Sequence, residues 1–123
     1  MKASIVISGG PESGTVLVLL RGAIDGSVST RIFDDVYAFH KEHPQLLKYL
    51  FDFDDVTEFD GKAISDLIGF HHLLARHGGQ MVIARPDAEI LQLFEKIGLS
   101  SSIEIARNLP EAEALLSAPE YED

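Results

Sequence analysis

The side chains in this sequence that could do chemistry are mainly carboxylates and imidazoles. Five acids fall close together: Asp52, Asp54, Asp55, Glu58 and Asp60. Their oxygens suit a hard cation, but the run lacks the glycine and the terminal glutamate of a calcium-binding loop. We therefore interpret these side chains as carboxylates that face water at the end of a strand, and we predict no metal site.

The histidines do not form a pattern typical of a metal or catalytic site. They are His40, His43, His71, His72 and His77. His71 falls near the apolar face of a predicted helix, which favours a packed, hydrogen-bonded side chain over a metal ligand. His40 and His43 come near a helix end, where a protonated imidazole would interact favourably with the carbonyl dipoles. No spacing supports a Ser-His-Asp triad.

Other signatures of catalysis are also missing. The sequence has no cysteine, which excludes disulfides, thiolate metal sites and cysteine nucleophiles. It has no phosphate-binding loop, because Gly61-Lys62 is followed by Ala63. The "GGPESG" segment joins two predicted strands, so it is not a dinucleotide-binding fingerprint. We predict no cofactor and no catalytic residue, and nothing in the sequence argues for an enzyme.

Length and charge narrow the range of partners. The chain has 123 residues, typical of one domain, and a formal net charge of −10. That charge repels nucleic acid and anionic membranes. It would also steer the protein toward a basic partner, or it only keeps a small domain soluble; both readings remain open. No apolar stretch approaches the roughly 20 residues of a membrane helix, and no signal peptide is visible. We expect a cytoplasmic protein without membrane insertion, and the oligomeric state is not indicated.

Hydrophobic periodicity predicts the elements that position these side chains. Strands are predicted at Ser4–Ile7, Thr15–Leu20, Leu46–Phe53, Gln80–Ala84 and Ile103–Ala106. Helices are predicted from Ser27, as N-cap, to just before Pro44, and at Asp60–His77, Asp87–Ile97 and Pro110–Leu116. The apolar run Thr15–Leu20 indicates a strand buried on both faces, and Gly22–Gly26 indicates a turn.

The order β-β-α-β-α-β-α-β-α predicts a single α/β domain over residues 1–118. Its first two strands would form a hairpin, and the later alternation favours a mixed, mostly parallel sheet covered by helices. Residues 119–123 are expected to be an acidic tail.

The turn Asp60-Gly61-Lys62-Ala63 joins a predicted strand to a predicted helix. As an N-cap, Asp60 can accept hydrogen bonds from the amides of Lys62 or Ala63. The first helical turn then presents partly positive amides. A hydroxyl at position 61 would be an exposed site for phosphorylation, but the residue is glycine. Gly61 therefore removes such a switch, or it only eases a tight turn.

Three segments together resemble the STAS domain, the fold of bacterial anti-sigma factor antagonists. "RGAID", residues 21–25, resembles the family's Gly-x-Leu/Ile-Asp. "LFDFDDVTEFDGKAI", residues 50–64, resembles the strand and turn that carry Asp-Ser-Ser-Gly-Leu. "RHGGQMVIARPDAEILQLFEKIGL", residues 76–99, resembles the segment of the fourth strand and third helix. The resemblance extends from about Ser4 to Leu116.

The resemblance implies a role in transcription regulation by partner switching. In that family an unphosphorylated antagonist binds an anti-sigma kinase and so frees a sigma factor, and the kinase then phosphorylates the first serine of Asp-Ser-Ser-Gly. Here Asp60 matches the aspartate, while Gly61, Lys62 and Ala63 replace Ser-Ser-Gly. The chain departs from the motif at the phosphorylated position.

The resemblance also implies where a partner would bind. The expected contact residues are Asp25, Asp60, Gly61, Lys62, Ala63 and Ser65. Ser65 and Thr57 are substitute positions for phosphorylation, and the charge of Lys62 could bind a carboxylate or phosphate on the partner. The expected partner is an anti-sigma factor of the kinase type. Two alternatives stay open: a STAS subunit or regulator that docks on a transporter ATPase, and a small-ligand sensor that uses the groove beside Lys62.

Overall fold

The computed structural model describes residues 2–9 and 14–117 of the chain. The elements are β1 (Ser4–Gly9), β2 (Thr15–Ile24), α1 (Gly26–Glu42), β3 (Lys48–Phe59), α2 (Gly61–Arg76), β4 (Gln80–Ala84), α3 (Ala88–Lys96), the 3-10 helix η1 (Leu99–Ser101), β5 (Glu104–Ala106) and α4 (Leu109–Ser117). Apart from η1, this order confirms the predicted one. The expected acidic tail at 119–123 lies outside the described residues.

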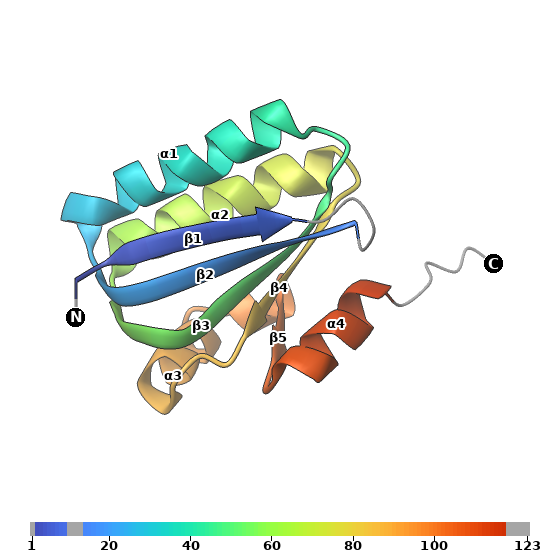
Figure 1. The fold of residues 1–123 in the computed structure, drawn as a ribbon. Helices are drawn as coiled ribbons and strands as arrows, with labels where there is room; N and C mark the ends of the chain where they lie inside the picture. The colour runs from blue at the N-terminus through green and yellow to red at the C-terminus, as the bar shows by residue number, and fades with distance from the viewer. Residues whose placement is uncertain (1, 10–13, 118–123) are drawn as a thin grey trace.

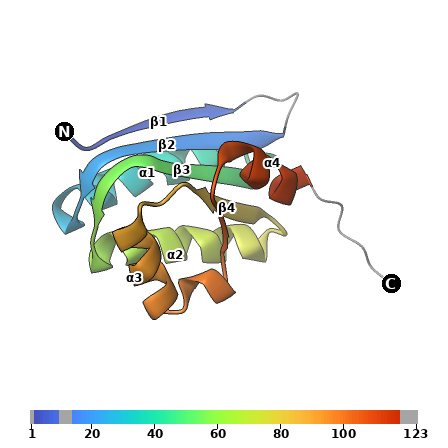
Figure 2. The same cartoon turned by 90° about the horizontal axis from the view of Figure 1, so that it is seen from below.

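The strands form one five-stranded sheet in the order β1-β2-β3-β4-β5. Strand β1 pairs antiparallel with β2, and the other neighbours are parallel, which confirms the predicted hairpin and mixed sheet. Helices α1 and α2 lie side by side against one face (Figure 1). Helix α4 packs against the other face, so that β4 passes between α4 and α2 (Figure 2).

Aromatic side chains fill the core between the sheet and the two long helices. Tyr49, Phe51 and Phe53 alternate along β3 and are fully buried. Phe70 of α2 meets the Tyr49 ring edge-on, with the ring centroids 4.9 Å apart. The alternation places these three side chains on one face of the sheet, where they set the position of α2.

Strand β2 differs from its prediction in two respects. Its burial alternates, with Val16, Val18 and Leu20 buried and Leu17 and Leu19 only partly so. The expectation of burial on both faces was therefore wrong, because no helix covers the outer face of β2 as fully as α1 and α2 cover the inner one. The predicted turn at Gly22–Gly26 is divided between two elements: Gly22 to Ile24 end β2, Asp25 is the N-cap of α1, and Gly26 begins that helix.

Strand β3 continues through Phe59, well past the predicted end at Phe53. Its pairing with β2 shifts register twice, between the pairs Leu19–Asp52 and Arg21–Asp55 and again after Gly22. Gly22, with φ of 84°, lies at the second shift. Such irregularities add residues to one strand while pairing continues. The polar stretch after Phe53, which the sequence left outside the strand, is therefore an irregular continuation of it.

The sequence suggested that all five carboxylates of the acidic run face water, but one of them is buried. Asp52 is only 4% exposed. Its two oxygens accept hydrogen bonds from Nε and Nη2 of Arg85, at 3.1 and 2.7 Å. Arg85 has φ of 60°, a left-handed conformation that is uncommon for a residue other than glycine. The paired charges compensate the cost of burying the carboxylate.

His40 lies inside the domain and does not cap a helix end as an imidazolium. Its side chain is 8% exposed, and its Nδ1 has no hydrogen-bond partner. Its ring contacts those of Tyr49, Phe70 and His77. Burial, and then the charge of His77, lower the pKa of His40. The neutral imidazole is therefore the form that fits the fold.

This burial predicts that acid weakens the fold. The pKa of His40 in the folded chain lies below its ordinary value of 6.5, so the unfolded chain takes up the proton first. The stabilisation is complete above the unfolded pKa, and it is lost as the pH falls from there through the lower pKa of the folded chain. The variant His40→Phe keeps an aromatic ring but cannot take up this proton. When the pH is lowered from about 7.5 to about 5.5, we expect its free energy of unfolding to fall less than that of wild type.

Urea unfolding at the two pH values measures this difference. His43→Gln is the control, since His43 is the C-cap residue at the same end of α1, and it should retain the wild-type pH dependence. Equal losses in wild type and His40→Phe would contradict the assignment.

Candidate partner-binding site

Asp60 connects the first turns of the two long helices. It is the N-cap of α2, and its Oδ1 accepts a hydrogen bond from the amide of Ala63 at 3.0 Å. Its Oδ2 accepts another from the amide of Gly26, the first residue of α1, at 2.8 Å. One carboxylate therefore satisfies an unpaired amide at each helix start and fixes the two ends side by side.

Asp25 caps α1 in the same region. Its side chain accepts hydrogen bonds from the hydroxyl and the amide of Ser27. These bonds, the hydroxyl first, lower the pKa of the Asp25 carboxyl. The prediction of Ser27 as N-cap was wrong by two residues, because β2 continues to Ile24 and leaves only Asp25 between strand and helix. Asp25 and Asp60 thus place two carboxylates at one edge of the sheet.

Gly61 and Gly26 serve different purposes at this edge. A Cβ on Gly61 would meet no atom within 4 Å, so a side chain there would project into open space. A Cβ on Gly26 would come within 3.1 Å of Cβ of Lys62. A side chain at Gly26 would therefore crowd Lys62 where the helices approach closely, whereas nothing around Gly61 crowds a side chain.

The charge of Lys62 is engaged within the chain. Its Nζ lies 2.7 Å from both carboxylate oxygens of Asp66 and donates to the Thr30 hydroxyl at 3.1 Å. Asp66 also accepts from the Ser29 hydroxyl at 2.7 Å. The Lys62 side chain is 49% exposed. Its charge is nevertheless already paired, because Asp66 lies one turn further along the same helix.

This polar cluster between α1 and α2 was not predicted from the sequence. The spacing of Lys62 and Asp66, four residues apart, is a signal that could have found the ion pair. The contributions of Ser29 and Thr30 depend on how the two helices pack, and no local pattern encodes that.

The remaining expected residues lie around the same turn. Ala63 is fully buried, and its backbone amide donates to Asp60. Ser65 is exposed on α2, one turn after Gly61. Thr57 and Asp60 line a hollow of about 280 Å³ that also includes Glu89 and Leu93 of α3. The structure thus groups Asp25, Asp60, Gly61 and Lys62 and leaves Ser65 and Thr57 at the margins.

Chemically, this edge offers hydrogen-bonding and charged groups for contact. Within residues 2–9 and 14–117, no three His, Asp or Glu side chains are grouped to hold a metal ion. None of the described helices is long and apolar enough to cross a membrane.

Comparison with known protein families identifies the family of the chain. The STAS domain matches residues 10–112 of the sequence. The chain belongs to the STAS domain family. No curated protein matches it. Proteins of this family related to anti-sigma factor antagonists are generally regulatory and non-enzymatic.

Solved STAS structures share the fold at low sequence identity. One is TM1081 of Thermotoga maritima, described as an anti-sigma factor antagonist, with a TM-score of 0.85, 11% identity, and coverage of 93% of this chain and 95% of that one. The unphosphorylated anti-sigma factor antagonist SpoIIAA has a TM-score of 0.69, 14% identity, and coverage of 91% and 94%. The phosphorylated form of SpoIIAA, a Bacillus cell fate determinant, has a TM-score of 0.67, 17% identity, and coverage of 91% and 96%.

The double role of Asp60 in this STAS domain predicts an unusually large effect of its removal. Asp60→Ala removes a cap and also leaves the Gly26 amide without its acceptor. We expect a loss of about 2 kcal/mol in the free energy of unfolding, against about 1 kcal/mol for a single cap. Urea unfolding measures both values.

Asp87→Ala is the matched control, because Asp87 caps only α3 through the amide of Ile90. Asp60→Asn separates the two contacts, since its amide group cannot accept from Gly26 while its oxygen still caps α2. A loss in Asp60→Ala no larger than that in Asp87→Ala would contradict the bridging role.

Proposed function

We propose that this STAS domain is a non-enzymatic regulatory module that binds a protein partner in the manner of an anti-sigma factor antagonist. The partner would be an anti-sigma factor of the kinase type in the bacterial cytoplasm. Binding would use the edge formed by Asp25, Asp60 and the exposed start of α2. The module would lack the phosphorylatable serine usual at position 61 and would stay competent to bind.

The open space around Gly61 carries this proposal. The first residue of α2 has no side chain and no neighbouring atom that limits access to it. The carboxylates of Asp25 and Asp60 flank it on exposed residues. A partner can therefore approach the start of α2 closely, and the overall charge of −10 favours a partner with a basic surface.

The ion pair between Lys62 and Asp66 bears on which residues would contact the partner. Because Asp66 already neutralises this charge, Lys62 adds little to the attraction of an anionic group. Its aliphatic stem packs against Gly26 and supports the turn. We therefore assign Lys62 chiefly to positioning, and the two aspartates to partner contact.

Blocking the start of α2 should abolish binding without unfolding the domain. We expect Gly61→Tyr to weaken partner binding at least about tenfold, because the ring would occupy the space that the partner approaches. The matched control is Ala75→Tyr, an exposed position near the other end of α2. Thermal unfolding confirms that both variants fold.

The measurement has two steps. Partners are first recovered from a lysate of the source cell and identified by mass spectrometry, and the purified partner is then titrated with each variant by calorimetry. Recovery of a kinase-type anti-sigma factor that binds wild type and Ala75→Tyr equally, and Gly61→Tyr poorly, would support the proposal. Recovery of a transporter subunit, or equal binding by Gly61→Tyr, would overturn it.

Restoring the hydroxyl should restore phosphorylation. Gly61→Ser has room for its side chain, so we expect it to fold like wild type and to accept a phosphate from the partner kinase and ATP. Intact-protein mass spectrometry should show the added phosphate in Gly61→Ser and not in wild type. A phosphate on wild type at Ser65 or Thr57 would show instead that a substitute position is used.

A further inference from the structure

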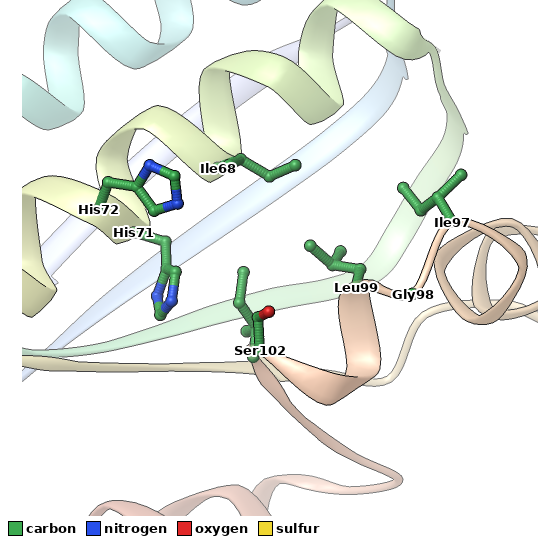
Figure 3. A pocket seen from close by; sticks show the side chains of 8 residues that line it. Ile68, His71, His72, Ile97, Gly98, Leu99 and Ser102 are labelled. Atoms are coloured by element: carbon green, nitrogen blue, oxygen red, sulfur yellow. The ribbon is translucent and has the colours of Figure 1, made fainter.

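A small cavity opens beside α2, away from the partner-binding edge. Its volume is about 120 Å³. The first lining residue on α2, Ile68, comes seven residues after Gly61, or about 10 Å along the helix. The opposite wall is the chain from the end of α3 through η1 to the start of β5 (Figure 3).

The cavity is lined mainly by apolar side chains, and the sequence did not predict it. Ile68, Leu99 and Ile103 form its buried or half-buried walls, and Ile97 stands 49% exposed beside them. The sequence predicted Ile97 as the last residue of the third helix, and in the structure it is the C-cap of α3. Gly98, with a left-handed φ of 79°, turns the chain there and leaves this side chain at the rim.

Polar groups lie at one side of the cavity. Figure 3 shows the His71 ring directed from α2 toward Ser102, with His72 next to it on the helix. The Ser102 hydroxyl makes no hydrogen bond with the part of the chain that the structure describes. No lysine or arginine is among the described residues that line the cavity.

The buried nitrogen of His71 determines which hydrogen-bonding group the ring can offer. Its Nδ1 is inaccessible to water and has no partner, contrary to the hydrogen-bonded histidine expected from the sequence. Burial, and then the charge of His72, lower the pKa of His71, so the ring is neutral near pH 7. A buried, unpaired Nδ1 cannot serve a ligand, so Nε2 is the ring nitrogen left to meet one. In the tautomer with the proton on Nε2, that atom is a hydrogen-bond donor.

Size and chemistry together define a ligand. A cavity of about 150 Å³ lined by apolar side chains holds one benzene molecule, so this one suits a single ring or a group of similar volume. The Nε2 donor of His71 and the Ser102 hydroxyl both suit an oxygen acceptor, and a neutral imidazole without nearby cations does not favour an anion. We propose that this cavity binds a small neutral molecule with one ring-sized apolar body and one oxygen acceptor, of the cyclic or aryl ketone class.

Cyclohexanone is a suitable probe, with methyl NMR of the wild-type chain as the readout. We expect saturable shifts of the Ile68, Leu99 and Ile103 methyl signals, with a Kd on the order of 1 mM for so small a ligand. Cyclohexylammonium and cyclohexanecarboxylate have the same ring without a neutral acceptor, and they should not produce these shifts.

Two variants test the polar contact. His71→Phe keeps the ring volume and removes the donor, so its affinity for cyclohexanone should fall about fivefold or more. Ser102→Ala, at an exposed position, tests the second donor and is expected to fold normally. His43→Gln is the control for removal of an imidazole outside the cavity.

The proposal would be overturned by the absence of saturable shifts in wild type. Equal cyclohexanone affinity in wild type, His71→Phe and Ser102→Ala would also overturn it, as would equal binding of the ammonium or carboxylate probe. The experiment needs no protein partner, so its outcome is independent of the proposed function.

Discussion

The carboxylate of Asp60 is the interaction on which the functional edge of this STAS domain depends. An isolated helix start leaves several amides unpaired, and two adjacent starts bring two sets of partly positive groups together. A single anion placed between them satisfies one amide on each helix, Ala63 on α2 and Gly26 on α1. It also joins segments that are 34 residues apart in the chain. The edge is therefore held by a tertiary contact as well as by two local caps.

This contact limits what the neighbouring residues can be. A side chain at Gly26 would crowd Lys62, which lies against it. Lys62 extends along the helix to Asp66, which also accepts from Ser29 of α1, so a second polar bridge lies about one turn beyond the first. Gly61 is free of these limits. Of the residues at this turn, it is the one that can change without disturbing the pairing of the helices.

The sequence predicted most of the fold, because most elements follow local rules. The apolar period of α2 and its cap at Asp60 gave that helix correctly, and the isolated run Gln80–Ala84 gave β4. The errors fall where long-range contacts decide the outcome. Asp52 reads as a surface acid until Arg85, far along the chain, is placed beside it. The sequence ended the third strand at Phe53, because the irregular remainder of β3 depends on its shifted pairing with β2. At the site, the cap at Asp60 was predicted, but the cap at Asp25 and the bridge from Asp60 to α1 were not.

Regulation of a chain with glycine at position 61 has to act through something other than charge at that point. A phosphate would repel Asp60 and Asp25 while attracting the amides of α2, and Gly61 offers no atom to carry it. Helix α2 reaches from this edge to the cavity beside His71, and its Phe70 ring packs on Tyr49 and Phe51. A ligand in the proposed cavity would therefore contact the same helix whose first turn lies at the proposed partner-binding edge. Such a ligand would change partner affinity only by favouring one position of α2 over another, and the Asp60 bridge to α1 is the contact that would resist such a shift. The strength of this bridge would therefore decide whether α2 could couple the two proposed sites.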